Sequence, residues 1–176
     1  MEKKYILTEE TKEVGGHILH RIQAMRDFGG VQKGDLGGWV ESEENLSHDG
    51  DCWIFDNGRV FDNGWVFGDG KVFGNGEVYG NGRVSGNGKV FGNAKIGFNA
   101  YISSPRSYFV QGPIGSRNDF LTCYLDKDKK IYAVTGCFCG SIEVFVKKVK
   151  AVHGMNRWAK QYLKAAEAAR VMLSED

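Results

Sequence analysis

The sequence predicts a mainly β protein: a short left-handed parallel β-helix of about three coils, with an N-terminal β-hairpin cap and a C-terminal α+β (ββαα) module. Three observations predict it. An aliphatic residue recurs every six positions in the middle of the chain, an alternating pattern around Gly15-Gly16 precedes it, and a hairpin pattern with two helical patterns follows it. We therefore divide the 176 residues into modules 1–50, 51–104 and 105–176.

The first module begins with two predicted strands in residues 4–26, joined at Gly15-Gly16 and alternating in polarity from His17 to Met25. Trp39 follows in a glycine-rich stretch. Because an uncapped solenoid end is costly, we expect Trp39 to lie across the open end of the prism as an apolar plug.

The second module repeats a hexapeptide nine times. Two positions after the aliphatic residue comes Asp or Gly in seven of the nine units, then usually Asn or Asp, then Gly or Ala, as in Val78-Tyr-Gly-Asn-Gly-Arg83. Asn and Gly tolerate left-handed backbone angles, so each unit is a short strand and a corner, and three units make one coil of a triangular prism. The repeated aliphatic residues are Ile54, Val60, Val66, Val72, Val78, Val84, Val90, Ile96 and Ile102.

Eighteen residues per coil would stack residues i and i+18, with the residue after each aliphatic one pointing outward. One outer face then carries a column of Phe55, Phe73 and Phe91. Contiguous apolar surface marks contacts, so the column is covered either within the chain or by another subunit. The predicted protein-binding residues are Phe55, Phe73, Phe91, Trp53, Phe61, Tyr79 and Trp65.

The repeats resemble those of the hexapeptide-repeat proteins, best known as bacterial acyltransferases. The stretches around Gly37-Gly-Trp-Val40 and Cys52-Trp-Ile54 are similar to the start of the YdcK-type subgroup. The resemblance implies a β-helix, trimers about the prism axis, and acyl transfer by a histidine general base. Residues 51–102 contain no histidine and no loop that interrupts the repeats, so the resemblance implies a scaffold only. Acyl transfer with His48 or His20 as the base remains an alternative.

The third module changes pattern. Asp119–Leu125 and Lys130–Cys137 predict a hairpin about a charged turn, Ser141 caps a helix to about His153, and Asn156 caps a second helix to about Leu173. Phe145, Val149 and Val152 should face inward on the first helix, and Ala159, Tyr162, Leu163, Ala166, Ala169 and Leu173 on the second. The stretch Gly136-Cys-Phe-Cys-Gly140 with a helix ending in His153-Gly154 resembles a small domain of phage and prophage proteins of Gram-positive bacteria.

Two groups of polar residues in this module are candidates for anion or nucleic-acid binding. The loop from Pro113 to Asn118 offers backbone amides with Ser116 and Arg117, the ingredients of a phosphate site. The helices add a basic surface, which a solvated helix face also explains. That surface comprises Lys147, Lys148, Lys150, Arg157, Lys160 and Lys164.

The four cysteines are scattered, as in proteins of a reducing compartment. A zinc site can be drawn from Cys123, Cys137, Cys139 and His153, but ordinary buried cysteines are the favoured interpretation. We predict no metal, cofactor or catalytic residue. No apolar run is long enough for a membrane span, and we expect a cytoplasmic protein.

The sequence favours a non-enzymatic interaction protein that forms dimers or trimers and binds a host protein or nucleoprotein. The resemblance implies a phage-encoded protein, and such an interaction protein could then be a counter-defence inhibitor such as an anti-CRISPR. The basic C-terminal surface would be the route to nucleic acid. The alternatives are a hexapeptide-repeat acetyltransferase and a nucleotide- or phosphate-binding module.

Overall fold

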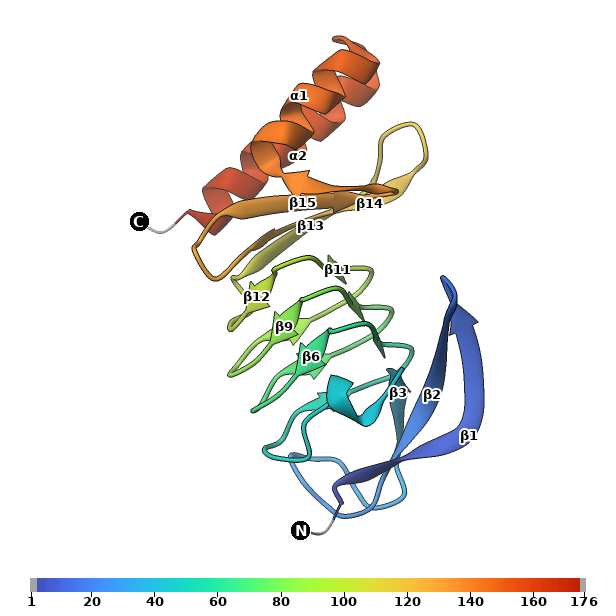
Figure 1. Ribbon diagram of the computed structural model, residues 1–176. Helices are drawn as coiled ribbons and strands as arrows, with labels where there is room; N and C mark the ends of the chain where they lie inside the picture. Colours follow the sequence, from blue (N-terminus) through green and yellow to red (C-terminus); the bar gives the residue numbers. More distant parts are fainter. Residues whose placement is uncertain (1–2, 175–176) are drawn as a thin grey trace. The chain divides into compact units, whose positions relative to one another are not determined.

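The computed structural model describes residues 3–174 (Figure 1). The chain divides into two compact units, Met1–Pro105 and Arg106–Asp176, each of which has its own sheets. Among the described residues, no helix is both long and apolar enough to cross a membrane.

The first unit is a left-handed β-helix with a hairpin on one face. Its nine hexapeptides form nine two-residue strands in parallel register, so that each residue pairs with the one eighteen positions later. They stack in three sheets, β4-β7-β10, β5-β8-β11 and β6-β9-β12 (Figure 1). The strands are β4 (Trp53–Ile54), β5 (Arg59–Val60), β6 (Trp65–Val66), β7 (Lys71–Val72), β8 (Glu77–Val78), β9 (Arg83–Val84), β10 (Lys89–Val90), β11 (Lys95–Ile96) and β12 (Tyr101–Ile102).

The repeat builds the prism as the sequence predicts. All nine aliphatic residues are fully buried, and backbone amides donate to the coil that follows, as from Phe73 N to Val90 O at 2.8 Å. In eight of the nine units the corner residue two positions after the aliphatic one has a positive φ, 54° at Asp56 and 64° at Gly74, for example. The small residue two positions further lies against the next coil, which leaves no room for a side chain there.

The N-terminal residues extend one of the three sheets. Strands β1 (Tyr5–Val14) and β2 (His17–Ala24) form the predicted hairpin, and β2 pairs with β3 (Leu36–Val40), which in turn lies parallel to β5. A 3-10 turn, η1 (Glu43–Asn45), and a bridge from Leu46 to Val66 complete an irregular coil before the first hexapeptide. The prism therefore has about four turns rather than three.

Trp39 does not close the end of the prism, so that prediction is wrong. It pairs in register with Arg59 on an outer face, where it packs with Leu19 of the hairpin and with Phe61. The residues near the N-terminal end of the prism are instead tied by polar contacts. The Tyr5 hydroxyl donates to Leu46 O at 2.7 Å, and the Asn45 amide donates to two backbone carbonyls of the next coil.

The second unit is a four-stranded antiparallel sheet with two helices (Figure 1). Its strands are β13 (Tyr108–Ile114), β14 (Asp119–Leu125), β15 (Ile131–Thr135) and β16 (Phe138–Ser141), in that order. The helices α1 (Ile142–His153) and α2 (Arg157–Leu173) follow, capped as predicted by Ser141 and Asn156. The predicted hairpin is correct, but the sheet has two further strands, β13 and β16.

The core of this unit confirms most of the predicted helix faces. Phe145 and Val149 of α1 pack with Tyr162 and the buried alanines of α2. Val152, expected on the same face, is instead 66 % exposed. The interpretation of the cysteines is half right, because Cys52 and Cys123 are buried whereas Cys137 and Cys139 are exposed.

Candidate functional site

The phenylalanine column (Phe55, Phe73 and Phe91) forms as predicted. Phe55 and Phe73 stack with centroids 4.6 Å apart and planes 4° from parallel, and Phe73 and Phe91 stack at 4.9 Å and 8°. Each ring follows a strand of the β4-β7-β10 sheet, so the backbone ladder holds the rings in register. Exposure reaches 47 % at Phe91. The face beside the column carries Lys71 and Lys89, which pair in register.

Several other predicted binding residues are covered within their own unit. Phe61 is buried under the hairpin against Leu19, and Tyr79 stacks on it at 5.5 Å. Trp53 is 1 % exposed, with edge contacts to Tyr5 and Phe28. The hairpin thus covers Phe61 on the β5-β8-β11 face, and Trp53 on the β4-β7-β10 face is buried by other residues, so neither ring is exposed to a partner, whereas Tyr79 is half-buried.

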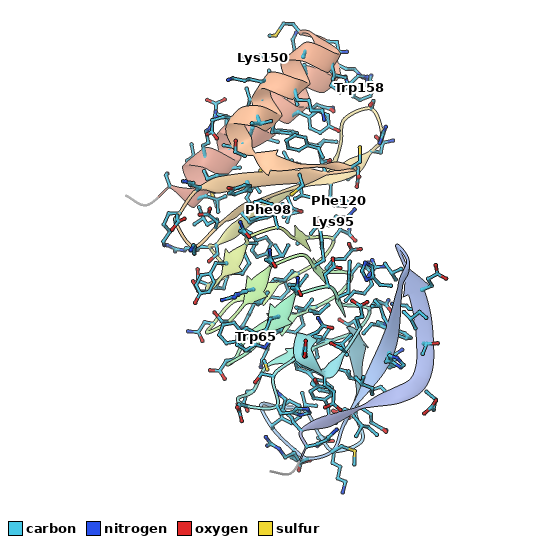
Figure 2. The ribbon with its side chains drawn as sticks, in the orientation of Figure 1. Trp65, Lys95, Phe98, Phe120, Lys150 and Trp158 are labelled. Carbon is cyan, nitrogen blue, oxygen red and sulfur yellow. The ribbon has the colours of Figure 1, made fainter. Side chains whose placement is uncertain are left out.

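The third face keeps two exposed aromatic rings. Trp65 is 36 % exposed and stacks on Phe67 at 4.0 Å, with the Arg83 guanidinium 6.0 Å from the Trp65 ring. Tyr101 follows in the same register at 37 % exposure. Figure 2 shows Trp65 at the outer surface of the β-helix. This face has a mixed aromatic and cationic character, in contrast to the uniform phenylalanine column.

A histidine bridges the hairpin and the β-helix. His17 Nδ1 lies 3.0 Å from Glu41 Oε1, and its Nε2 lies 3.4 Å from Asp62 Oδ1. The hydrogen bond to Glu41 raises the pKa of His17 above its ordinary value, and the same bond lowers the pKa of Glu41. Among the described residues, these three form the one group of His, Cys, Asp and Glu with ligand atoms within 4.8 Å of one another. Since both ring nitrogens face carboxylates, we interpret the group as an ion-pair clamp, which the sequence analysis missed.

The two histidines considered for acyl transfer both have structural contacts. His48 stacks on Tyr5 at 4.3 Å and accepts a hydrogen bond from Lys4 N at 3.2 Å, while its Nε2 lies 3.7 Å from Glu43 Oε2. His20 Nδ1 lies 3.2 Å from Thr8 O. The buried Nε2 of His48 forms no hydrogen bond among the described residues. Because a carboxylate lies beside its ring, His48 is the stronger of the two as a candidate base.

Basic residues project from both helices of the second unit. Lys147, Lys150, Arg157, Lys160 and Lys164 are all exposed, and Arg157 stacks on Trp158 at 3.8 Å. Lys150 and Trp158 are labelled in Figure 2. The helices therefore present the predicted cationic surface.

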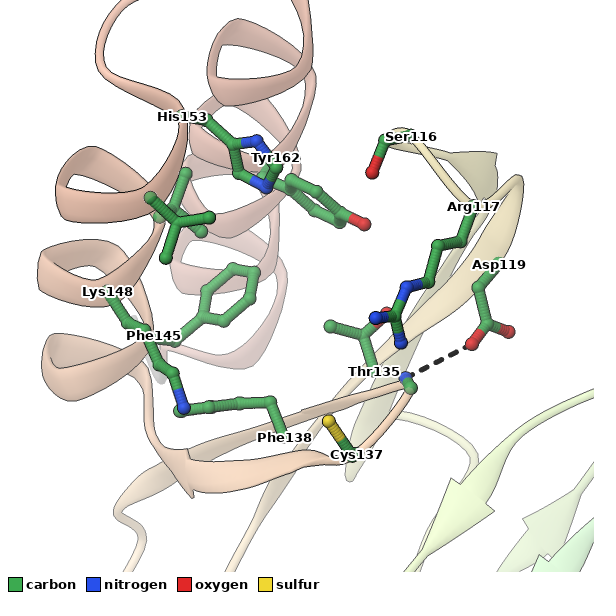
Figure 3. A pocket seen from close by; sticks show the side chains of 13 residues that line it. Ser116, Arg117, Asp119, Thr135, Cys137, Phe138, Phe145, Lys148, His153 and Tyr162 are labelled. Atoms are coloured by element: carbon green, nitrogen blue, oxygen red, sulfur yellow. Dashed lines mark hydrogen bonds between the residues drawn. The ribbon is translucent and has the colours of Figure 1, made fainter.

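Ser116 and Arg117 lie in the turn between β13 and β14, at the rim of a pocket of about 370 Å³ (Figure 3). The turn is held against α2, because Gly115 N donates to Gln161 Oε1 at 2.9 Å and a Cβ at Gly115 would overlap the Tyr162 hydroxyl. The pocket also takes side chains from β15, β16 and both helices. Its lining residues are Ser116, Arg117, Asp119, Thr135, Gly136, Cys137, Phe138, Phe145, Lys148, Val149, Val152, His153 and Tyr162.

The structure brings Arg117 together with residues that sequence reasoning did not connect to it. The sequence placed Lys148 on the basic surface and placed His153 and Tyr162 on the two helices. In the structure all three line the same pocket as Arg117. Their convergence depends on how α1 and α2 pack on the sheet. Lys147 and Lys150, by contrast, lie outside the pocket lining.

Comparison with known proteins supports the repeat architecture. No family model matches the chain. A curated relative, described as "Uncharacterized acetyltransferase YdcK" from Escherichia coli (strain K12), is 33 % identical over a 66-residue alignment that covers 33 % of this chain. The match spans about a fifth (20 %) of the length of that relative. The similarity and the nine stacked strands together show a hexapeptide-repeat β-helix.

Proposed function

We propose that this protein is a non-enzymatic interaction protein, in which a rigid β-helix presents the phenylalanine column to a second copy of the chain. The observation that carries the proposal is the stacking of the three rings in near-parallel planes on one face of the prism. Because the backbone ladder fixes the rings, association loses little conformational entropy at this surface.

The column has the properties of a contact surface. Three adjacent aromatic rings form a continuous apolar strip, and such strips on folded proteins usually mark interfaces. The neighbouring face of the same β-helix shows an aromatic pair that is used as a contact surface, since Phe61 and Tyr79 pack against the hairpin. Dimers through identical patches are the commonest oligomers, and a strip of identical rings is self-complementary.

The flanking charges make this association dependent on salt. Lys71 and Lys89 lie beside the column and would approach their counterparts in a second copy. Like charges repel less as salt screens them, so added salt should strengthen self-association. An interface dominated by opposite charges would weaken instead.

The size of the protein in solution tests the proposal. Wild type should have a mass above the 19.6 kDa of one chain, and Phe73→Asp, at the centre of the column, should reduce it to one chain. Tyr101→Asp is the matched control, because it places the same charge at an exposed aromatic position on another face. The proposal fails if Phe73→Asp is folded and keeps the wild-type mass, or if both variants dissociate equally.

The proposal extends to a second, heterologous partner at the basic surface of α1 and α2. Its residues Lys147, Lys150, Lys160 and Lys164 are exposed and suit an acidic protein or a nucleoprotein. A phage-encoded protein acting in the host cytoplasm, with a host protein as target, is the setting we propose for it. Pull-down from host lysate with wild type and a variant carrying all four lysines as glutamates would identify such a partner.

Acyl transfer is the second candidate function, favoured by the Glu43 carboxylate 3.7 Å from His48 Nε2 and by the match to a relative described as an acetyltransferase. A carboxylate orients a histidine base through its protonated nitrogen, which leaves Nδ1, the acceptor of the Lys4 N hydrogen bond, as the basic nitrogen of His48. Acetyl-CoA turnover by wild type that disappears in His48→Ala and persists in His20→Ala would establish it. No turnover in wild type would remove this candidate and leave the interaction proposal.

A further inference from the structure

We propose that the pocket of the Arg106–Asp176 unit binds a small organic phosphate with a flat apolar body, the class to which mononucleotides belong. The pocket places the Arg117 guanidinium and the Lys148 ammonium beside an aromatic floor (Figure 3). This site is independent of the phenylalanine column, because all of its residues belong to the other unit.

The floor of the pocket is apolar and firmly held. Phe145, Val149 and Tyr162 are 3 %, 5 % and 8 % exposed and belong to the core of the unit. The Phe145 and Tyr162 rings meet edge to face, with centroids 5.7 Å apart and planes at 89°. Phe138 adds a further ring 5.4 Å from Phe145. Phe145 and Tyr162 are buried and supply an apolar floor, so a flat ring would stack on the half-buried Phe138; stacking contributes about 1–3 kcal/mol per base in nucleic-acid complexes.

The rim of the pocket carries the cations. Figure 3 shows the Arg117 side chain extended over the mouth of the pocket toward Thr135, with Lys148 reaching over Phe138 from α1. Neither cation forms an ion pair within residues 3–174, so both charges remain available to an anion. A guanidinium binds phosphate with two parallel hydrogen bonds, and the Ser116 and Thr135 hydroxyls lie on the same rim as further donors.

One acidic residue lines the pocket, and its carboxylate is already occupied. Asp119 Oδ2 accepts from Gly136 N at 3.1 Å, and Oδ1 accepts from Phe120 N at 2.7 Å. The bond from Gly136 N holds the β15–β16 turn at the pocket wall (Figure 3). With Arg117 and Lys148 against Asp119, the lining has a net positive charge that favours an anion.

The volume of the pocket suits a small molecule rather than a polymer. Ligand pockets measure about 300–1,000 Å³, and a volume of about 370 Å³ lies at the lower end, enough for one ring system with one anionic group. The exposed lysines of the helices lie outside the lining, so a polyanion that bound them would not depend on Arg117. The aromatic floor and cationic rim together therefore favour a mononucleotide over free phosphate.

Calorimetric titration of the full chain with AMP, GMP, adenosine and inorganic phosphate tests the inference. We expect AMP or GMP to bind at least about tenfold more tightly than either adenosine or phosphate, because only the nucleotide uses both parts of the site. Arg117→Ala and Lys148→Ala should each weaken nucleotide binding by about tenfold. Lys150→Ala, which removes an exposed lysine of the same helix outside the pocket, is the matched control and should leave binding unchanged.

Three results would overturn the inference. The first is no binding of either nucleotide up to about 5 mM. The second is equal affinity for adenosine and AMP, and the third is an equal loss of nucleotide affinity in Lys148→Ala and Lys150→Ala. Ser116→Glu provides a second test that keeps Arg117, since an exposed carboxylate at the rim should repel the phosphate and leave the fold intact. Adenosine binding should not change in that variant.

Discussion

The glycines at the inner corners of the β-helix give a prediction that can be worked from the structure. A Cβ built at Gly70 would lie 2.7 Å from Val84 O and 2.9 Å from Val84 C, in the backbone of the next coil. Normal contacts begin near 3.4 Å, so Gly70→Ala must push the two coils apart. In the last coil the equivalent positions are Ala94 and Ala100, both buried, where no further hexapeptide coil follows.

The cost follows from the contacts that the shift would disturb. The amides of Trp65 and Phe67 donate to Gly82 O and Val84 O, each at 3.0 Å, across the same coil boundary. Weakening these two hydrogen bonds costs about 1 kcal/mol each, and overpacking a core costs about 1–3 kcal/mol. We expect Gly70→Ala to lower the free energy of unfolding by about 3–5 kcal/mol, or roughly 12–25 °C in melting temperature for a unit of this size.

The control is Gly92→Asn at an outer corner. Gly92 has φ of 63° and no atom within 4 Å of a built Cβ, and Asp56 and Asp62 adopt similar angles of 54° and 53° elsewhere in the repeat. Asparagine tolerates this conformation, so the variant should cost less than about 1 kcal/mol. Thermal denaturation followed by tryptophan fluorescence measures both. Gly70→Ala within about 0.5 kcal/mol of wild type, or a larger loss in Gly92→Asn, would refute the account of the repeat.

Three further predictions follow from single contacts. His17→Gln should destabilise the protein most near pH 5.5. The pKa of His17 is raised in the folded state, so the stability it adds is fully present below pH 6.5, its pKa in the unfolded chain, and is lost as pH rises through the folded pKa. A loss of stability that does not depend on pH would contradict this. Asn156→Ala removes the cap of α2 and should cost about 1 kcal/mol in urea denaturation, whereas Asn156→Asp should retain most of it. Iodoacetamide should modify Cys137 and Cys139 in the native protein and spare the two buried thiols, as mass spectrometry of the alkylated chain would show; a third modified cysteine would argue against the packing described.

The β-helix could be predicted because its signal is local. Six residues specify a strand and its corner, and the repeat at Ile54, Val60 and Val66 fixes the stacking without reference to distant residues. The coil before it was missed, since Val40 and Leu46 pair with residues twenty positions later rather than eighteen. An offset that departs from the repeat leaves no periodic pattern to recognise.

The missed strands of the second unit have local causes as well. Gly112 and Pro113 interrupt β13, whose register shifts there, and β16 contains only four residues. Both are edge strands of the sheet, and neither has a fully buried residue. The inner strand β14, whose last five residues are all buried, has a strong apolar signal and was predicted.

The pocket could be predicted only in part. Ser116 and Arg117 are adjacent in a turn, so their chemistry can be recognised in the sequence. Lys148 and Tyr162 join them from two helices, and only the packing of α1 and α2 on the sheet brings them together. The covering of Phe61 by the hairpin is likewise a long-range contact that the repeat does not encode.

Sedimentation equilibrium of the wild-type protein over a dilution series tests the central claim most directly. Self-association through the phenylalanine column predicts a mass that is a multiple of 19.6 kDa at protein concentrations on the order of 100 μM, which falls on dilution and rises with added salt. A single species of 19.6 kDa at every concentration and salt level would contradict it.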